Sequence, residues 1–483
     1  MVSKHDMKKI HDWLWEIPKS YRADMRVDAR LYVDERFLDR TLQDNSVEQL
    51  VNTATLPGII GPALAMPDIH EGYGFPIGGV VAVRHPDGVI SPGGVGYDIN
   101  CGVRLLASHV HIDELHPHKD DLITAIYYTV PSGVGSTGGI KLSPKQMDQV
   151  LSKGAAWVIS QGHGNPDDLE RLESQGCMAE ADPDRVGKRA RERGKDQLGT
   201  LGSGNHFLEI DQVTKIFDRA AAETFGLFEG QVVIQIHSGS RGLGHQVCDD
   251  YIRVMQQAVR KYQIELPDRQ LGCAPINSPE GQDYLSAMAA AANFAWANRQ
   301  MMASLVQDAF AQILAGHSRN RDLYTVYDVA HNIAKIEMHT IDGKQVKVCV
   351  HRKGATRAFG PGHPELPASY RESGQPVLVP GDMGTASFVL VGTAQAMEKS
   401  FGSCCHGAGR VLSRKAAQRQ VDGADLQRQL TERGIAIRAG KLSGLAEEAP
   451  QAYKEIDHVV DTIERAELAR KVARLEPIAV MKG

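Results

Sequence analysis

Residues 91–104 read Ser91-Pro-Gly-Gly-Val-Gly-Tyr-Asp-Ile-Asn-Cys-Gly-Val-Arg104, which places one aspartate and one cysteine among glycines. Glycine permits positive φ angles and lets a ligand approach the backbone closely, so such a run is typical of a binding turn. The chain has 48 glycines in 483 residues, about 10% where about 7% is usual. Because much of the surplus lies in this run, in residues 66–79 and beside several histidines, we expect the glycines to build a site.

The hydrophobic pattern around this run predicts both helices and strands. Helices are expected at 6–15, 46–54, 182–196, 282–315, 408–418 and 450–474, of which 282–315 is apolar nearly all round and therefore buried. Strands are expected at 80–83, 232–237, 324–330, 333–339, 345–351, 376–380 and 387–391. Because these elements do not alternate regularly, the sequence predicts an α+β fold and not a doubly wound sheet. We expect one large domain over residues 1–483, with a mainly helical insertion near 282–316 and a helical segment at 408–474.

The charge balance and the cysteines restrict the class of protein. Lys and Arg number 54 and Asp and Glu number 59, a formal charge of −5, which disfavours a generic nucleic-acid binder but leaves room for a local basic groove. The seven cysteines form no Cys-x-x-Cys pair, which favours a reducing cytosol over a disulfide scaffold. Since the chain has no run of about 18 apolar residues and its first residues lack a signal-peptide core, we expect a cytoplasmic protein with no membrane contact.

Several residues that can bind metal or attack phosphorus stand in glycine-, serine- or asparagine-bearing contexts. They are Asp98, Cys101, His206, His237, His331 and His406. Any one histidine alone is more often a hydrogen-bonded structural residue, but repetition at the ends of apolar segments favours an active site of strand-end loops. A thiolate with imidazoles is a soft, zinc-like donor set, and only Asp98 favours manganese. The signatures of a P-loop, a Rossmann site and a His-Glu-x-x-His protease are missing.

Three further segments follow the first run along the chain. They are Gly202-Ser-Gly-Asn-His-Phe207, His237-Ser-Gly-Ser-Arg-Gly242 and Cys405-His-Gly-Ala-Gly-Arg410. With these motifs the chain resembles the RtcB family of RNA-splicing ligases, in matches that run in order from about Pro67 to Lys482. The resemblance implies an RtcB-type fold, in which mixed sheets form a central cleft flanked by helices. Residues 107–200 and 415–450 contribute little to it.

The resemblance implies a ligase that depends on manganese and GTP and joins an RNA 3′-phosphate or 2′,3′-cyclic phosphate to an RNA 5′-hydroxyl. In this family a histidine, here His406, attacks the α-phosphate of GTP and forms a histidine–GMP phosphoramide. GMP then passes to the RNA 3′-phosphate, and the 5′-hydroxyl displaces it. The RNA would be tRNA halves or broken RNA ends, and the family often uses an archease-type activator.

The same motifs imply ligands for two manganese ions that share Cys101, with His237 and His331 on one ion and Asp98 and His206 on the other. Glu209 would accept hydrogen bonds from the guanine edge and so select GTP over ATP. Asp382 departs from the small polar residue expected there, which leaves its role open. The nucleotide positions are Asn205, His206, Phe207, Leu208, Glu209, His331, Asn332, Pro380, Gly381, Asp382, Met383, Ser387, His406, Gly407, Ala408, Gly409, Tyr453 and Lys482. The cations expected at RNA phosphates are Arg193, Arg241, Lys353, Arg410 and Arg414.

Two other functions remain open at this point. The same cluster of Cys, His and Asp would suit a metal-dependent phosphoesterase that opens cyclic phosphates without ligation. The chain could also be a non-catalytic RNA-binding subunit. Formation of protein-bound GMP at His406 distinguishes the ligase from both alternatives.

Overall fold

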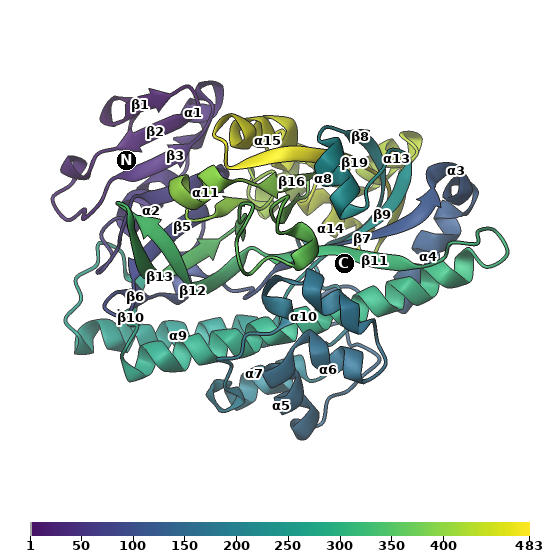
Figure 1. Cartoon of the computed structure of the whole chain (residues 1–483), viewed down its shortest axis with the longest axis horizontal. Helices are drawn as coiled ribbons and strands as arrows, with labels where there is room; N and C mark the ends of the chain where they lie inside the picture. Colours follow the sequence, from purple (N-terminus) through teal and green to yellow (C-terminus); the bar gives the residue numbers. More distant parts are fainter. Residues whose placement is uncertain (1) are drawn as a thin grey trace.

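Two β-sheets of seven and eight strands form the frame of the computed structural model, which describes residues 2–483 (Figure 1). The first sheet has the order β1 (Lys8–His11), β2 (Leu14–Ile17), β3 (Ala29–Tyr32), β4 (Ala63–His70), β5 (Ile77–Arg84), β13 (Lys344–Lys353) and β12 (Asn332–Ile341). The second has the order β11 (Leu323–Ala330), β7 (Gly102–His111), β9 (Gln231–Ser238), β8 (Phe207–Ile216), β19 (Ala469–Lys482), β16 (Ser387–Gly392) and β15 (Pro376–Val379), and β18 (Ala436–Ala439) pairs with β19. Two short pairs join β6 (Val89–Ile90) to β10 (Ala274–Pro275) and β14 (Ala355–Arg357) to β17 (Ser403–Cys405). Since most strand pairs are antiparallel and a few are parallel, the predicted α+β class with mixed sheets is confirmed.

The eight-stranded sheet curves until its edge strands β11 and β15 come into contact, so it nearly closes into a barrel. Side chains of β7 alternate between its two faces. Val103 and Leu105 pack inside the curve with Tyr327. Leu106 packs on the opposite face, against helices α4 (Lys119–Thr129) and α10 (Pro279–Ile313). These strands are therefore buried on both faces, which is why they appear in the sequence as nearly continuous apolar runs.

Helix α10 runs along the length of the molecule beside the sheets (Figure 1). The Ser278 side chain caps its first turn by accepting a hydrogen bond from the Gly281 N–H over 3.1 Å, and Pro279 occupies the first helical position. Side chains from Ala287 to Met302 are buried almost without interruption. The long buried helix predicted at 282–315 is therefore confirmed.

The other helices cover the faces and ends of the sheets. They are α1 (Glu35–Thr41), α2 (Ser46–Thr53), α3 (Ile112–Leu115), α5 (Pro144–Lys153), α6 (Ala155–Ser160), α7 (Lys188–Gly194), α8 (Arg219–Phe225), α9 (Arg241–Lys261), α11 (Ala394–Lys399), α12 (Arg414–Gln420), α13 (Gly423–Glu432), α14 (Leu442–Glu447) and α15 (Ile456–Arg465). The helix predicted at 46–54 is confirmed as α2, and the charged segment 182–196 contains α7. Among residues 2–483, no helix combines the length and the apolarity that a membrane crossing requires.

Three predicted helices are wrong in whole or in part. Residues 6–15 contain β1 and the start of β2, because Trp15 and Ile17 are buried alternately and β2 pairs with β3. Residues 408–413 form a loop, and α12 begins only at Arg414, after its cap Ser413. In 450–474 the helix α15 covers only Ile456–Arg465. After a short turn β19 begins at Ala469, because pairing with β8 and β16 outweighs local propensity.

Candidate active site

A cavity of about 770 Å³ opens at the edge of the eight-stranded sheet where β7 and β8 begin and β9 and β11 end. Its wall also includes the loops that follow β4 and β17. All six residues that the sequence analysis selected as ligands or nucleophile line this cavity, namely Asp98, Cys101, His206, His237, His331 and His406. Strand-end loops from distant parts of the chain therefore meet at one site, as the repeated pattern predicts.

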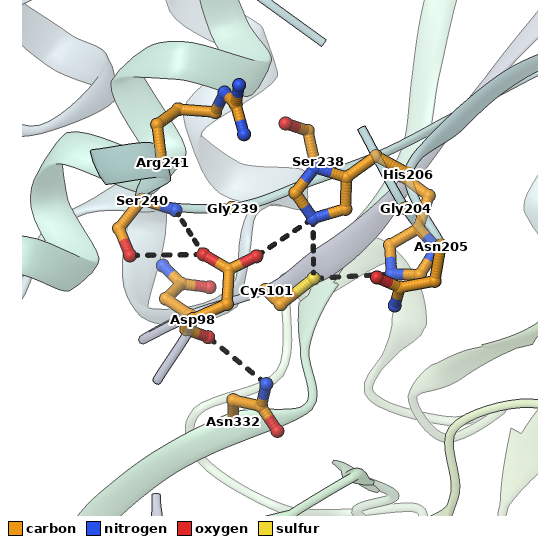
Figure 2. Close-up of polar contacts among 12 residues, drawn as sticks. Asp98, Cys101, Gly204, Asn205, His206, Ser238, Gly239, Ser240, Arg241 and Asn332 are labelled. Carbon is orange, nitrogen blue, oxygen red and sulfur yellow. Dashed lines mark hydrogen bonds and ion pairs between the residues drawn. The ribbon is translucent and has the colours of Figure 1, made fainter. Parts of the chain in front are cut away.

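Two groups of metal-ligand side chains share Cys101. Its Sγ lies 3.3 Å from His206 Nε2 and 3.3 Å from His237 Nε2. In the first group His206 Nε2 lies 2.8 Å from Asp98 Oδ2 (Figure 2). In the second group His237 Nε2 lies 3.3 Å from His331 Nε2. Within each group the ligand atoms all lie within 4.8 Å of one another, a spacing that suits two ions on either side of a bridging thiolate.

A buried arginine of α10 holds the loops that present these ligands. Arg299 donates to Asp328 through Nε and Nη2, at 2.7 to 3.1 Å, and to the carbonyls of Asn100 and Ser238 through Nη1, at 2.8 and 2.9 Å. Asn100 precedes Cys101 and has a φ of 52°, a left-handed conformation that favours Asn and Gly. The long helix thus fixes the Cys101 turn against the ends of β9 and β11.

Further hydrogen bonds orient the first ligand group. His206 donates its Nδ1–H to the Leu201 carbonyl over 2.9 Å, which turns Nε2 toward Asp98 and Cys101. The Ser240 N–H donates to Asp98 Oδ1 over 3.0 Å (Figure 2). Burial acts to raise the pKa of Asp98, but the hydrogen bond and the charge of His206 outweigh it, so the pKa is lowered. Asp98 therefore offers an anionic oxygen that could bind a metal ion.

The electrostatic environment of the second group fits a bound cation. Burial lowers the pKa of His237 and of His331 well below the usual range, so both imidazoles are neutral while their Nε2 atoms face each other. Burial and the Asp98 charge raise the pKa of the Cys101 thiol. A divalent cation reverses this effect because it stabilises the coordinating thiolate. The donor set is thus suited to two divalent ions.

A buried carboxylate that the sequence analysis did not select holds His406. Its Nδ1–H donates to Asp68 Oδ2 over 2.6 Å, and its backbone N–H donates to the same oxygen over 3.0 Å. Asp68 lies in β4 and is fully buried. The hydrogen bond keeps the proton on Nδ1 and leaves the lone pair on Nε2, which could attack an electrophile. Since the His406 and His331 ring centres are 4.9 Å apart, this imidazole adjoins the two groups that share Cys101.

The C-terminal strand β19 reaches the cavity, where Lys482 forms part of the wall. Lys482 lies in β19 opposite Phe207 of β8, and its Nζ donates to the Gly204 carbonyl over 3.1 Å. The same Nζ lies 4.0 Å from the buried carboxylate of Glu448, which the sequence analysis did not select. Burial raises the pKa of Glu209, and the Asp211 charge raises it further. The buried acids Glu209 and Glu448 thus lie in the same region as Lys482.

Sixteen of the eighteen predicted nucleotide positions line the cavity, and Leu208 and Ser387 do not. Leu208 packs in the core beside α10, whereas Ser387 Oγ accepts a hydrogen bond from the Gly381 N–H over 3.1 Å and orients that loop. Asp382 shapes the same loop, because its carboxylate accepts from the Gly384 N–H at 3.0 Å and the Thr385 hydroxyl at 2.9 Å. The unexpected acid at 382 therefore has a structural role in a turn.

The five predicted phosphate-binding cations differ in their surroundings. Arg241, Lys353, Arg410 and Arg414 line the cavity. Arg193 does not, but it lies beside α9, where its Nη1 donates to Gln246 Oε1 over 3.1 Å. Burial lowers the pKa of Lys353 to about 7, and its Nζ donates to backbone carbonyls of the loop after β4. The cavity wall thus brings four of the five predicted cations together, but Arg410 and Arg414 are ion-paired with the buried Glu448.

The comparisons with known proteins agree over nearly the whole chain. The family model described as "RtcB: tRNA-splicing ligase RtcB" matches residues 49–483. A tRNA-splicing ligase RtcB of Archaeoglobus fulgidus is 53% identical over 477 residues, and one of Thermococcus kodakarensis is 54% identical over 477 residues, each match covering 99% of both chains. A third, of Methanococcus maripaludis, is 49% identical over 480 residues, which cover 99% of this chain and 100% of the relative.

Proposed function

The chain belongs to the RtcB family of tRNA-splicing ligases and is an RNA ligase, and we propose that it joins RNA ends through a GMP adduct on His406 with two manganese ions. The observation that carries this proposal is the position of His406, which is held by Asp68 and adjoins the Cys101 ligand groups. A histidine with its proton fixed on Nδ1 presents Nε2 to an electrophile. Phosphoryl transfer relies on a positioned nucleophile and on charge neutralisation, and this cavity offers an imidazole beside two groups that could hold metal ions.

In the first step Nε2 of His406 attacks the α-phosphorus of GTP. The Nε2–phosphorus bond forms as the bond to the bridging oxygen breaks, and pyrophosphate leaves. Asp68 stabilises the positive charge that develops on the imidazole. An RNA 3′-phosphate oxygen then takes GMP from His406, and the 5′-hydroxyl finally attacks the activated 3′-phosphate and releases GMP. A 2′,3′-cyclic phosphate must first be hydrolysed: water attacks phosphorus, the bond to O2′ breaks, and a 3′-phosphate and a 2′-hydroxyl result.

Asp98, Cys101 and His206 would hold one manganese ion, and Cys101, His237 and His331 the other. When bound, these ions supply the charge neutralisation that phosphoryl transfer requires. The donors alone are soft enough for zinc, so the choice of manganese follows the family. We propose that Glu209 binds the guanine edge and that Lys482 and Tyr453 complete the nucleotide site, since all three line the same cavity.

RNA is the substrate that the ligase family implies, and we propose tRNA halves or broken RNA ends. Arg193, Arg241, Arg410 and Arg414 would contact its phosphates. Lys353 donates to loop carbonyls, so we assign it to holding that loop. We also propose that an archease-type protein activates the ligase and that the ligase is cytoplasmic. The seven free thiols support a reducing compartment. Residues 1–483 would act as one catalytic domain, because the site residues extend from Asp68 to Lys482.

The test is to incubate the protein with α-labelled GTP and manganese and to measure acid-labile, protein-bound GMP. We expect wild type to form the adduct and His406→Ala to form none. His458→Ala is the matched control, because His458 lies outside the cavity wall. An adduct that persists in His406→Ala would exclude His406 as the nucleophile. Absence of any adduct on wild type, together with opening of cyclic phosphates, would favour the phosphoesterase.

A further inference from the structure

The cavity has an aromatic end that neither the metal ligands nor the nucleotide positions use. Tyr73, Tyr97 and His245 all line it. The two tyrosine rings meet edge to face, with 5.7 Å between their centres and 68° between their planes. Tyr97 also faces His245, with ring centres 6.0 Å apart. Because Tyr97 directly precedes Asp98, this aromatic end adjoins the first ligand group.

Packing in the protein core does not account for these rings. Both tyrosines are half-buried, and neither joins a hydrophobic cluster among the described residues. Tyr284, Tyr327 and Tyr370, in contrast, are fully buried members of such clusters. An aromatic face turned toward a cavity is apolar surface that a flat ligand can cover.

The backbone of Tyr73 is fixed on both sides. Lys353 Nζ donates to the Tyr73 carbonyl over 2.6 Å. The side chain of Gln49 donates to the Gly72 carbonyl over 2.6 Å and accepts from the Gly72 N–H over 3.0 Å. A ring carried by a fixed backbone loses little conformational freedom when a ligand stacks on it.

Arg241 lines the same cavity as the two tyrosines. Arg241 begins α9, and His245 in the next turn also lines the cavity. Arg193 of α7 reaches the same turns through its hydrogen bond to Gln246. Aromatic faces next to cations are the combination that binds single-stranded nucleic acids, where bases stack and phosphates are neutralised.

We propose that Tyr73 and Tyr97 form a stacking site for the terminal base of an RNA strand at the ligation junction, while Arg193 and Arg241 hold the adjoining phosphates. The inference rests on the proposed function, because it requires RNA ends to lie beside the ligand groups. Every base offers a π face, so such a site accepts ends of any sequence. It therefore explains how a ligase can position a terminal nucleotide without reading its identity.

The experiment compares ligation of RNA ends whose terminal nucleotide is intact or abasic. One arm places the abasic nucleotide at the 3′-phosphate end, and the other places it at the 5′-hydroxyl end. In one of the two arms, we expect the abasic nucleotide to lower the kcat/KM of wild type by about five- to 150-fold relative to intact ends. This is the range that loss of one base–aromatic stack produces. Tyr73→Ala should show a comparable loss with intact ends and no further loss with abasic ends. Tyr73→Trp should restore sensitivity to the base.

Tyr128→Ala serves as the control, because Tyr128 is 81% exposed and is not part of the cavity wall. Tyr97→Ala is assayed together with its metal content, since Asp98 is the next residue. Equal sensitivity of wild type and Tyr73→Ala to the abasic ends, or no sensitivity of wild type in either arm, would overturn the stacking site.

Two separate measurements distinguish failure of the proposed function from failure of the stacking site. The GMP adduct is measured on the same wild-type preparation, and its absence counts against the proposed function alone. Stacking is then measured directly with RNA that carries terminal 2-aminopurine. We expect wild type to quench this fluorescence and Tyr73→Ala to quench it less. Equal quenching by both proteins would refute the proposal even if no ligation occurs.

Discussion

Replacement of Asp68 by Asn should slow formation of the His406–GMP adduct far more than it destabilises the fold. One oxygen, Asp68 Oδ2, accepts both the Nδ1–H and the backbone N–H of His406, while Oδ1 has no hydrogen-bond partner among the described residues. An asparagine can keep its carbonyl oxygen at the Oδ2 position and place its NH₂ at the Oδ1 position. The geometry can therefore persist while the negative charge is lost.

The size of the effect follows from these contacts. A hydrogen bond to a charged group contributes about 1.5–3 kcal/mol and a neutral one about 0.5–1.5 kcal/mol. Loss of the charge alone should therefore cost about 1–2 kcal/mol, or roughly five- to thirtyfold in rate. If the amide flips, its NH₂ faces Nδ1 and forces the proton onto Nε2. In serine proteases, where the corresponding Asp→Asn exchange fixes the wrong tautomer, the loss is about 10⁴-fold. We therefore expect a decrease of about five- to 10⁴-fold.

The assay is single-turnover adduct formation with α-labelled GTP at saturating manganese, followed by acid-free gel separation. Metal content and thermal unfolding are measured on the same samples, so that loss of ions or of fold is not mistaken for loss of the nucleophile. Asp39→Asn is the control, because this exposed aspartate lies outside the cavity wall. A rate for Asp68→Asn within twofold of wild type would refute the role assigned to Asp68.

Three further predictions concern the ligands, the base site and a buried acid. Cys101→Ala should reduce bound manganese from two ions toward zero and abolish ligation, as checked by elemental analysis; two retained ions would contradict a bridging thiolate. Glu209→Gln should lower the preference for GTP over ATP in adduct formation by about ten- to 150-fold, the value of one charged hydrogen bond, and an unchanged ratio would exclude Glu209 from base recognition. Burial raises the pKa of Asp211 to about 7 in the folded protein. The protonated carboxyl therefore stabilises the fold fully at pH values below the pKa of the unfolded chain, and this stabilisation is lost as the pH rises toward 7. Asp211→Asn should remove this loss and be more stable than wild type above pH 7 in thermal unfolding; equal pH profiles would contradict this assignment.

Local pattern was sufficient to predict the strands and helices whose burial is regular. The runs at 232–237 and 324–330 are buried on both faces of one sheet, so they are continuously apolar and easily recognised. Helix α10 is equally clear, because its middle is enclosed on all sides. The strands β1 and β2 in 8–17 and the start of β19 at 469–474 were not predictable in this way, since their pairing partners β3, β8 and β16 are set by the fold and not by local pattern.

The same distinction applies to the site. Asp98, Cys101 and His406 stand out because glycines surround them, and the cavity contains all three. Asp68 and Arg299 act through hydrogen bonds to residues that lie far away in sequence, and no local motif marks them. Asp68 does lie in the glycine-rich segment 66–79, which was the available signal. Sequence pattern thus identifies groups that touch ligands more readily than groups that orient them.

The central position of β19 has a consequence for how the chain folds. This strand lies between β8 and β16, and its Lys482 contacts Gly204, which is 278 residues earlier. During synthesis the edges of β8 and β16 stay unpaired until β19 emerges, and unpaired edges invite pairing with other chains. Such long-range pairing is also intrinsically slow. Nascent chains should therefore depend on chaperones that shield these edges, and the cavity forms only in the last stage of folding.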